Sequence, residues 1–208
     1  MTKVRDFDKD AQSWDDSPLR TNLAKEVAAA IMRQVGLKEG MDVLDFGCGT
    51  GLLSFNIRPL VRSVTGVDTS KGMLDVFLAK ARQHGGGNMK AYLLDLTLNE
   101  RLSGSYHLVM SSMTLHHVKD TRMLVEQFYK VLEDGGHLAL ADLDVEDGRF
   151  HDSHDGVFHL GFDRVQLVRL LEVVGFREVS CSKATQICKA DAEGQERVFS
   201  VFLITGRK

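Results

Sequence analysis

Three closely spaced glycines near residue 50 limit the fold of this 208-residue chain more than any other feature. The apolar run Val43–Phe46 leads into Gly47, Gly49 and Gly51, and a second apolar run follows. This pattern is typical of a buried strand that turns sharply into a helix. Glycine lacks a Cβ, so a ligand can approach the main chain beside the unpaired N–H groups of that helix. The loop therefore predicts either a tight turn alone or a site for a nucleotide-like ligand.

The spacing of the glycines separates two classes of cofactor site. The dinucleotide fingerprint G-x-G-x-x-G/A needs a small residue at position 52, where this chain has Leu52. The pattern here is G-x-G-x-G, preceded by the acid Asp45. After the next apolar run, Asp68 stands about twenty residues beyond the glycines, where an acid can accept both hydroxyls of a ribose. The alternative is that Asp68 only caps the helix that follows.

These motifs resemble motif I of the class I (Rossmann-like) methyltransferases that use S-adenosylmethionine (SAM), in particular small-molecule enzymes like those of ubiquinone and menaquinone biosynthesis. The resemblance implies SAM as the cofactor and S-adenosylhomocysteine (SAH) as its product, with the glycine loop against the methionine part. The cofactor-binding residues that we predict are Trp14, Asp45, Gly47, Cys48, Gly49, Asp68, Thr69, Met73, Asp95, Leu96 and Ser111.

Some of these residues have a particular place in the resemblance. A stretch like 7–15 folds over the cofactor as part of a lid, so Trp14 covers the cofactor or, alternatively, only anchors the arm to the core. Asp95 lies by the adenine amino group, with Leu96 against the ring face. Cys48 is a common small filler at its position, so we expect it to pack rather than to act as a nucleophile.

Alternating apolar and helical segments predict an α/β fold. Strands are expected at 43–46, 63–68, 91–95, 108–111 and 137–142, and after Asp163 a helix with Val165, Val168, Leu170 and Leu171 facing inward. Two last runs, 178–188 and 197–205, joined by residues 190–194, predict a hairpin that adds an antiparallel edge. We therefore expect one domain, 1–208, with a doubly wound, mostly parallel seven-stranded sheet, helices on both faces and an antiparallel last strand. Residues 1–22 are predicted as an N-terminal lid arm and 143–162 as a lid insertion.

Polar or glycine residues follow several of these strands. Ligands of open α/β sheets bind outside the carboxyl ends of the strands, and Gly47, Asp68, Asp95, Ser111 and Asp142 all fall there. Their convergence predicts one binding site at this edge of the sheet.

The fourth strand is followed by two candidate bases, His116 and His117. SAM supplies the reactivity of methyl transfer, and a base is needed only where the acceptor must lose a proton. The alternative role of both histidines is to form the pocket wall. Methyltransferases acting on amino groups of bases or of glutamine usually carry Asp or Asn, two prolines and an aromatic residue here, whereas this chain has Ser111–Thr114. A small-molecule acceptor is therefore expected.

The stretch after the fifth strand is rich in His and Asp. His and carboxylate ligands together suit Zn²⁺ or Fe²⁺, but the spacing of His151, His154 and His159 matches no closed metal site. We predict no metal and place these three histidines, with His116, in the acceptor pocket.

Composition limits the partners and the compartment. The net charge is −3, and no block of Lys or Arg stands out, so neither nucleic acid nor a membrane surface is expected as a partner. No apolar run approaches the ~18 residues of a membrane span. Cys48, Cys181 and Cys188 are odd in number and no secretory signal is seen, which predicts a cytoplasmic protein. The sequence gives no oligomeric state.

Three functions fit these features. The leading one is transfer of a methyl group from SAM to a small molecule by in-line displacement. A SAM- or SAH-binding sensor or scaffold without transferase activity is the alternative, because all the clear motifs are cofactor motifs. A nicotinamide-dependent oxidoreductase is disfavoured by Leu52 and by the terminal hairpin.

Overall fold

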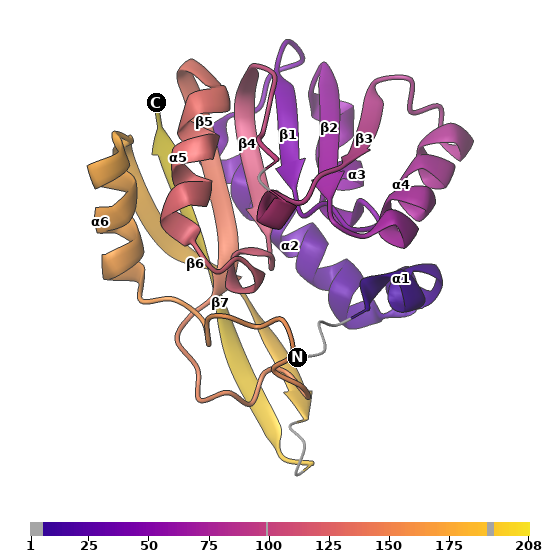
Figure 1. Cartoon of the computed structure of the whole chain (residues 1–208), viewed down its shortest axis with the longest axis vertical. Coiled ribbons are helices and arrows are strands. Elements are labelled where there is room, and N and C mark those ends of the chain that lie inside the picture. Colours follow the sequence, from indigo (N-terminus) through magenta and orange to yellow (C-terminus); the bar gives the residue numbers. More distant parts are fainter. Residues whose placement is uncertain (1–5, 99, 191–193) are drawn as a thin grey trace.

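The computed structural model describes residues 6–98, 100–190 and 194–208. Within these ranges seven strands form one sheet in the order β3-β2-β1-β4-β5-β7-β6 (Figure 1). Strands β1 to β5 are parallel, and β7 is antiparallel to both of its neighbours. The predicted fold class is therefore confirmed. Part of the predicted connection 190–194 lies outside the described residues.

Every predicted strand is present, with small differences at the ends. The strands are β1 (Asp42–Phe46), β2 (Ser63–Asp68), β3 (Met89–Leu93), β4 (Tyr106–Ser112), β5 (Leu132–Leu143), β6 (Arg177–Ala190) and β7 (Glu196–Arg207). The reversed strand β7 lies inside the sheet, and β6 forms the edge. The third strand was predicted to end at Asp95 but ends at Leu93.

The helices alternate with the strands as predicted. They are α1 (Phe7–Asp10), α2 (Pro18–Val35), α3 (Leu52–Ile57), α4 (Lys71–Gln83), α5 (Thr121–Val131) and α6 (Arg164–Val174). Short 3₁₀ turns are η1 (Ala11–Asp16), η2 (Arg58–Leu60), η3 (Leu96–Leu98) and η4 (Leu115–His117).

The helix ends are set by capping residues that can be recognised in the sequence. Asp120 caps α5 by accepting the Met123 N–H at 2.9 Å, and Asp163 caps α6 in the same way. Helix α2 ends where Gly36 takes a left-handed conformation with φ of 62°.

Two helical layers cover the sheet (Figure 1). Val43 packs with α2 and α3, whereas its neighbour Leu44 packs with α5 and α6. The buried face of α6 consists of Leu167 and Leu171. The prediction that Val165 faces inward is wrong, because its side chain is 59% exposed on the first turn of α6.

Three segments lie beyond the carboxyl ends of the parallel strands: α1 with η1, the connection between β5 and α6, and the last part of β6 with the first part of β7 (Figure 1). Strand β5 ends at Leu143 and α6 begins at Arg164, so residues 144–163 connect them, and the lid role of the insertion 143–162 stays a prediction. Helix α2 begins at Pro18, so the last part of the predicted arm 1–22 is helix. Residues 1–5 of that arm lie outside the described part of the chain.

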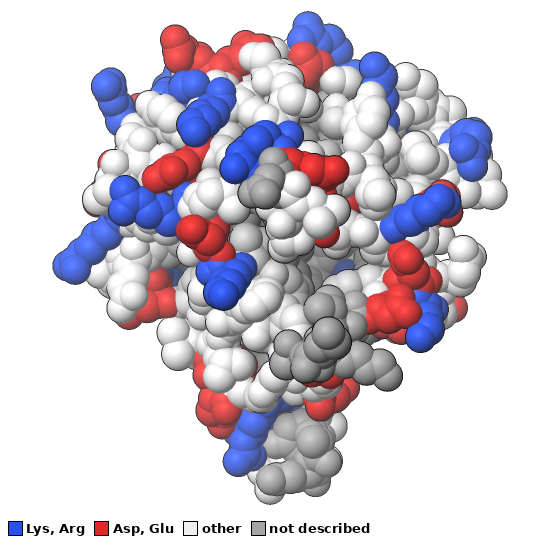
Figure 2. Space-filling model, in the orientation of Figure 1, with Lys and Arg blue, Asp and Glu red and all other residues white. Residues whose placement is uncertain are grey.

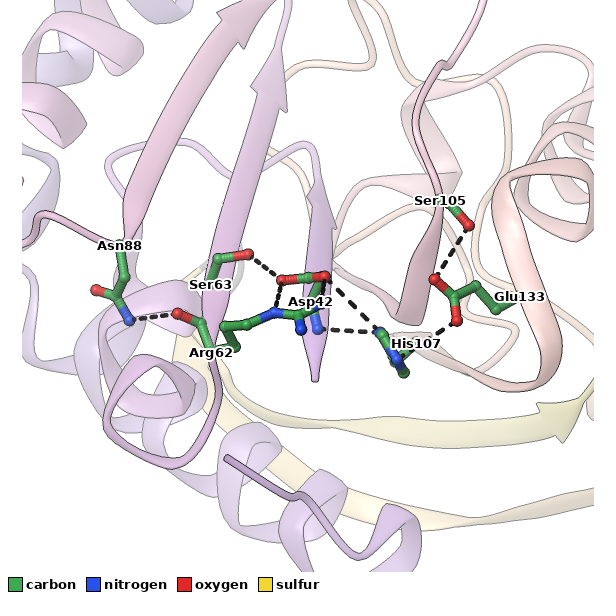
Figure 3. Close-up of polar contacts among 7 residues, drawn as sticks. All are labelled: Asp42, Arg62, Ser63, Asn88, Ser105, His107 and Glu133. Carbon is green, nitrogen blue, oxygen red and sulfur yellow. Dashed lines mark hydrogen bonds and ion pairs between the residues drawn. The ribbon is translucent and has the colours of Figure 1, made fainter. Parts of the chain in front are cut away.

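A polar network joins the amino ends of the strands, opposite the glycine loop (Figure 3). The carboxylate of Asp42 accepts hydrogen bonds from Arg62 and, at 2.6 Å, from the Ser63 hydroxyl. These bonds, the one from Arg62 first, lower the pKa of Asp42 to about 2. The Asp42 N–H donates to His107 Nδ1 at 3.2 Å, and His107 Nε2 lies 3.4 Å from Glu133 Oε2. The network fixes the register of neighbouring strands.

The surface carries both signs of charge. On the face in Figure 2, Lys and Arg alternate with Asp and Glu, and no large patch of one sign is visible. Among the described residues, the longest apolar helical stretch falls short of what a membrane crossing requires.

Candidate functional site

A cavity of about 420 Å³ lies at the carboxyl ends of β1, β2 and β4. Its walls come from the glycine loop, the N-terminal arm, the start of α2, the β4–α5 connection, the segment after β5 and the end of β6. Of the predicted cofactor residues, those that line it are Trp14, Asp45, Gly47, Cys48, Gly49, Asp68, Thr69 and Met73. Segments far apart in the sequence thus meet in one place. Of the five strand-end residues expected to converge there, Gly47 and Asp68 line the cavity, whereas Asp95, Ser111 and Asp142 do not.

The glycines of the loop have different structural tasks. All three have positive φ. A Cβ on Gly47 would lie 2.3 Å from Thr114, and one on Gly51 would lie 2.6 Å from Phe77, so both positions are closed by packing. A Cβ on Gly49 would meet only Met73 Sδ, at 4.0 Å. The main chain at Gly49 is therefore open toward the cavity.

Asp45 is a buried carboxyl on the wall of this cavity. It is 1% exposed, and it accepts a hydrogen bond from the Ser54 hydroxyl at 2.6 Å. Burial raises the pKa of Asp45 to about 7, and the charge of Asp68 acts in the same direction. A positively charged group in the cavity would favour its ionised form.

Asp68 ends β2 and holds the glycine loop from the opposite side. Its carboxylate accepts the N–H of Gly49 at 2.8 Å and the N–H of Ser70 at 2.9 Å. Burial nevertheless raises the pKa of Asp68. A carboxylate has about four lone-pair positions, so it can accept further hydroxyl donors from a ligand.

Cys48 packs as expected. Its side chain is buried, and burial raises the pKa of the thiol well above its usual range. A Cβ on Gly66 of β2 would lie 2.6 Å from Cys48 Sγ, so the glycine in the strand makes room for the sulfur. A buried, protonated thiol is a poor nucleophile.

The N-terminal arm is fastened across the cavity by two aspartates. Asp8 accepts the Ser70 hydroxyl at 2.5 Å and the Gly72 N–H at 2.7 Å. These bonds lower the pKa of Asp8, that from Ser70 most. Asp15 accepts the Thr50 hydroxyl at 2.5 Å and pairs with Lys80 at 2.6 Å. The arm is thereby tied to both the glycine loop and α4.

Trp14 lies in the arm between these two attachments. The guanidinium of Arg20 lies 3.8 Å from the centre of its ring, and Phe7 contacts its edge at 5.9 Å between ring centres. Phe7 in turn contacts His117 at 5.5 Å. The indole therefore forms part of a cover that reaches from α2 to the β4–α5 connection.

His116 is buried at the cavity and is paired with a buried acid. Its Nδ1 lies 2.7 Å from Asp142 Oδ1, and both side chains are at most 2% exposed. Asp142 also accepts the backbone N–H groups of Leu143 at 2.7 Å and of His116 itself at 3.3 Å. The carboxylate thus fixes the imidazole with its proton on Nδ1, so that Nε2 is the basic nitrogen.

The other predicted histidines separate into two groups. His117 and His151 line the cavity, and the ring centres of His116 and His151 are 4.9 Å apart. His117 Nδ1 donates to the Gly156 carbonyl at 2.7 Å, so Nδ1 carries a proton, because a carbonyl oxygen only accepts.

The structure does not bring His154 and His159 to the cavity. The ring of His154 bonds to the Gly148 carbonyl at 2.7 Å, and that of His159 to the Val118 carbonyl at 3.0 Å. His154 thus bonds within its own segment, whereas His159 ties that segment to the β4–α5 connection. Within the described ranges no group of three or more His, Cys, Asp or Glu is arranged to hold a metal ion.

Three predicted cofactor residues also lie outside the cavity wall. Strand β3 ends two residues earlier than predicted. The Asp95 carboxylate accepts hydrogen bonds from the N–H and the hydroxyl of Thr97 at 2.8 and 2.7 Å, and Leu94 lines the cavity instead. Leu96 packs against the core beneath α5. Ser111 is fully buried and donates to the Phe46 carbonyl at 2.8 Å, while its neighbour Ser112 reaches the cavity.

Sequence reasoning missed the wall opposite the glycine loop. Phe150 and Asp152 from the segment after β5 and Ile187 and Lys189 from β6 line the cavity there. The alternating pattern of β6 predicts a strand, but not that its end curls over a site formed by the parallel strands. Arg20, in the first turn of α2, also lines the cavity and was not among the predicted residues.

Comparisons with known proteins fit this arrangement. A model of the family described as a methyltransferase domain matches residues 19–180. An uncharacterized methyltransferase of Schizosaccharomyces pombe is 34% identical over 169 residues, which cover 74% of this chain and 58% of that protein. A ubiquinone biosynthesis O-methyltransferase of Vibrio parahaemolyticus is 26% identical over 156 residues, 68% of this chain and 62% of that enzyme. The chain thus spans about 60% of the length of these relatives.

Solved structures share the fold. The phosphoethanolamine N-methyltransferase 2 of Haemonchus contortus, in complex with S-adenosyl-L-methionine, superposes with a TM-score of 0.71 at 17% identity. The superposition covers 99% of this chain and 60% of the Haemonchus chain.

Proposed function

The chain belongs to the methyltransferase-domain family, and from this premise we propose that it transfers a methyl group from SAM to the hydroxyl of a small-molecule acceptor. The observation that carries the proposal is the single cavity that joins the glycine loop, Asp45 and Asp68 to the His116–Asp142 pair. We assign the glycine loop and the two acids to the cofactor, and His116 to the acceptor as its base.

The residues assigned to the cofactor suit SAM in shape and in charge. The open main chain at Gly49 gives room for the methionine part, and Asp68 offers acceptor positions for the two ribose hydroxyls. Asp45 supplies negative charge close to a ligand whose sulfonium is positive. Arg20, which lines the same cavity, is a cation suited to the methionine carboxylate. Trp14 covers this part of the cavity.

When bound, SAM supplies an electrophilic methyl group, so the protein has to align the acceptor and exclude water. The arm fastened by Asp8 and Asp15 closes one side of the cavity. The segment after β5 closes the other through the bond between its Gly156 carbonyl and His117.

His116 is the base we assign, in preference to His117. An acceptor hydroxyl loses its proton as the new bond to carbon forms, and His116 Nε2 takes it up. Asp142 stabilises the imidazolium that results, because its carboxylate already accepts the Nδ1 proton at 2.7 Å. The relatives named as ubiquinone biosynthesis O-methyltransferases support oxygen as the accepting atom.

A SAM sensor without transferase activity needs no such base. The buried His116–Asp142 pair, and a cavity that continues past it to Phe150 and Lys189, favour an enzyme with a second ligand.

The test is transfer of tritium from [methyl-³H]SAM to a mixture of hydroxylated small molecules. We expect wild type to label an acceptor, and His116→Ala to lower the rate by about 10² to 10⁴-fold, the usual effect of a general base. The matched control is His159→Ala, which removes a histidine of the same region that lies outside the cavity. Both variants should bind SAH as wild type does. Equal rates in His116→Ala and wild type would remove the base from the mechanism.

A further inference from the structure

Acidic and basic side chains line different walls of the cavity. Asp45 and Asp68 face it from β1 and β2, whereas Lys189 faces it from β6. Four strands separate β2 from β6 in the sheet, so Lys189 comes from a different wall of the cavity than these two acids. The proposed function assigns Asp45 and Asp68 to SAM, but it assigns no role to Lys189.

Lys189 is held at the wall rather than extended into water. Its side chain is 21% exposed, its Nζ donates to the Phe150 carbonyl, and it lies 5.1 Å from the centre of the Phe150 ring. Ile187, two residues earlier on the same face of β6, adds an apolar wall. An ammonium group taken out of water in this way needs an anionic partner to offset its desolvation.

The carboxylate that Lys189 meets within the protein is a weak partner. Asp152 Oδ1 lies 3.5 Å from Nζ, but the Asp152 side chain is 86% exposed. An ion pair of this kind contributes little, since water screens it and the long side chain must be ordered. An anion bound inside the cavity, away from water, would interact with Lys189 more strongly.

Ring contacts connect Lys189 to the base. Phe150 packs against His151 with ring centres 4.8 Å apart, and His151 packs against His116 at 4.9 Å. The wall between the cation and the base is therefore aromatic and suited to a flat or apolar body.

Resting on the proposed function, we propose that the acceptor is a hydroxylated acid, whose carboxylate or phosphate binds Lys189 while its hydroxyl faces His116. The acid group displaces Asp152 from Nζ, and the body of the molecule lies along Phe150 and Ile187. Lys189 is then the residue that selects acidic acceptors over neutral ones.

The experiment compares matched acidic and neutral probes by calorimetry on the SAH-saturated protein. The probes are 4-hydroxybenzoate with its methyl ester, and 4-hydroxyphenyl phosphate with hydroquinone. We expect at least one acid to bind tenfold or more tightly than its neutral partner, and the pair that shows this separates carboxylate from phosphate. Equal binding within both pairs, or binding of neither acid, would overturn the proposal.

Two variants assign the preference to its residue. Lys189→Gln removes the charge but keeps a donor for the Phe150 carbonyl, so it should abolish the preference for acids without loosening the wall. The control is Lys183→Gln, an exposed lysine of the same strand that bonds to Gln186. A preference that survives in Lys189→Gln would refute the assignment. The affinity for SAH is measured separately in each protein. If SAH did not bind, the proposed function would fail. The acidic and neutral probes would then be titrated into the SAH-free protein, where their difference in affinity would still test the role of Lys189.

Discussion

Asp45→Asn should change how stability depends on pH, because the carboxyl it replaces is buried and costly to ionise. Asp45 is 1% exposed, and its side chain has the Ser54 hydroxyl as hydrogen-bond donor. Its pKa rises from 3.8 to about 7 on folding, mainly through burial. The folded protein therefore holds a proton at Asp45 between these two pH values, where the unfolded chain has released it.

The size of the effect follows from linkage. A difference between 3.8 and about 7, at about 1.36 kcal/mol for each pH unit, amounts to about 4 kcal/mol. Because the folded pKa is the higher one, this stabilisation is complete below pH 3.8 and is lost as the pH rises through about 7. Above pH 7 the ionised carboxylate destabilises the ligand-free fold. The asparagine side chain does not titrate, so the variant lacks this pH dependence.

The assay is urea unfolding of both ligand-free proteins at intervals from pH 4.5 to 8.5. We expect the free energy of unfolding of Asp45→Asn to gain on wild type as the pH rises, by up to about 4 kcal/mol at pH 8. Parallel curves for Asp45→Asn and wild type would show that Asp45 does not titrate in this range.

Two further perturbations test other parts of the account. Asp68→Ala removes the carboxylate that we assign to the ribose hydroxyls and should weaken SAH binding by about 1.5–3 kcal/mol for each charge-assisted bond lost. Asp75→Ala, which changes an exposed acid of α4, should leave the calorimetric affinity unchanged. Equal affinities in all three proteins would show that the ribose is misplaced. Asp42→Asn should lower the free energy of unfolding at pH 6, because Arg62 and Ser63 stabilise the native carboxylate. The difference from wild type should disappear as the pH falls from 3.8 through about 2. Urea unfolding in which the full difference persists at pH 2 would contradict this.

The sheet could be predicted from the sequence because each strand has a recognisable local residue pattern. Val43–Phe46 is a short run, apolar except for Asp45, that ends in glycines, and this pattern is typical of a buried strand. Helix ends at Asp120, Asp163 and Gly36 follow from capping chemistry within one turn of the chain.

Positions that depend on one residue of register were harder. Ser111 and Ser112 are equivalent in composition, yet one is buried against Phe46 and the other reaches the cavity, since successive strand residues face opposite sides. Asp95 was misplaced because β3 ends at Leu93, where no glycine or proline marks the boundary. Lys189 had no local signal, because its place in the cavity depends on how the β6–β7 hairpin extends past the sheet.

The central claim is that the glycine loop, Asp45 and Asp68 bind SAM. Calorimetric titration of the ligand-stripped protein with SAH, and with NAD⁺ and NADP⁺ in parallel, tests it most directly. We predict micromolar binding of SAH and no binding of either nicotinamide. Absence of SAH binding, or binding of a nicotinamide in its place, would contradict the account.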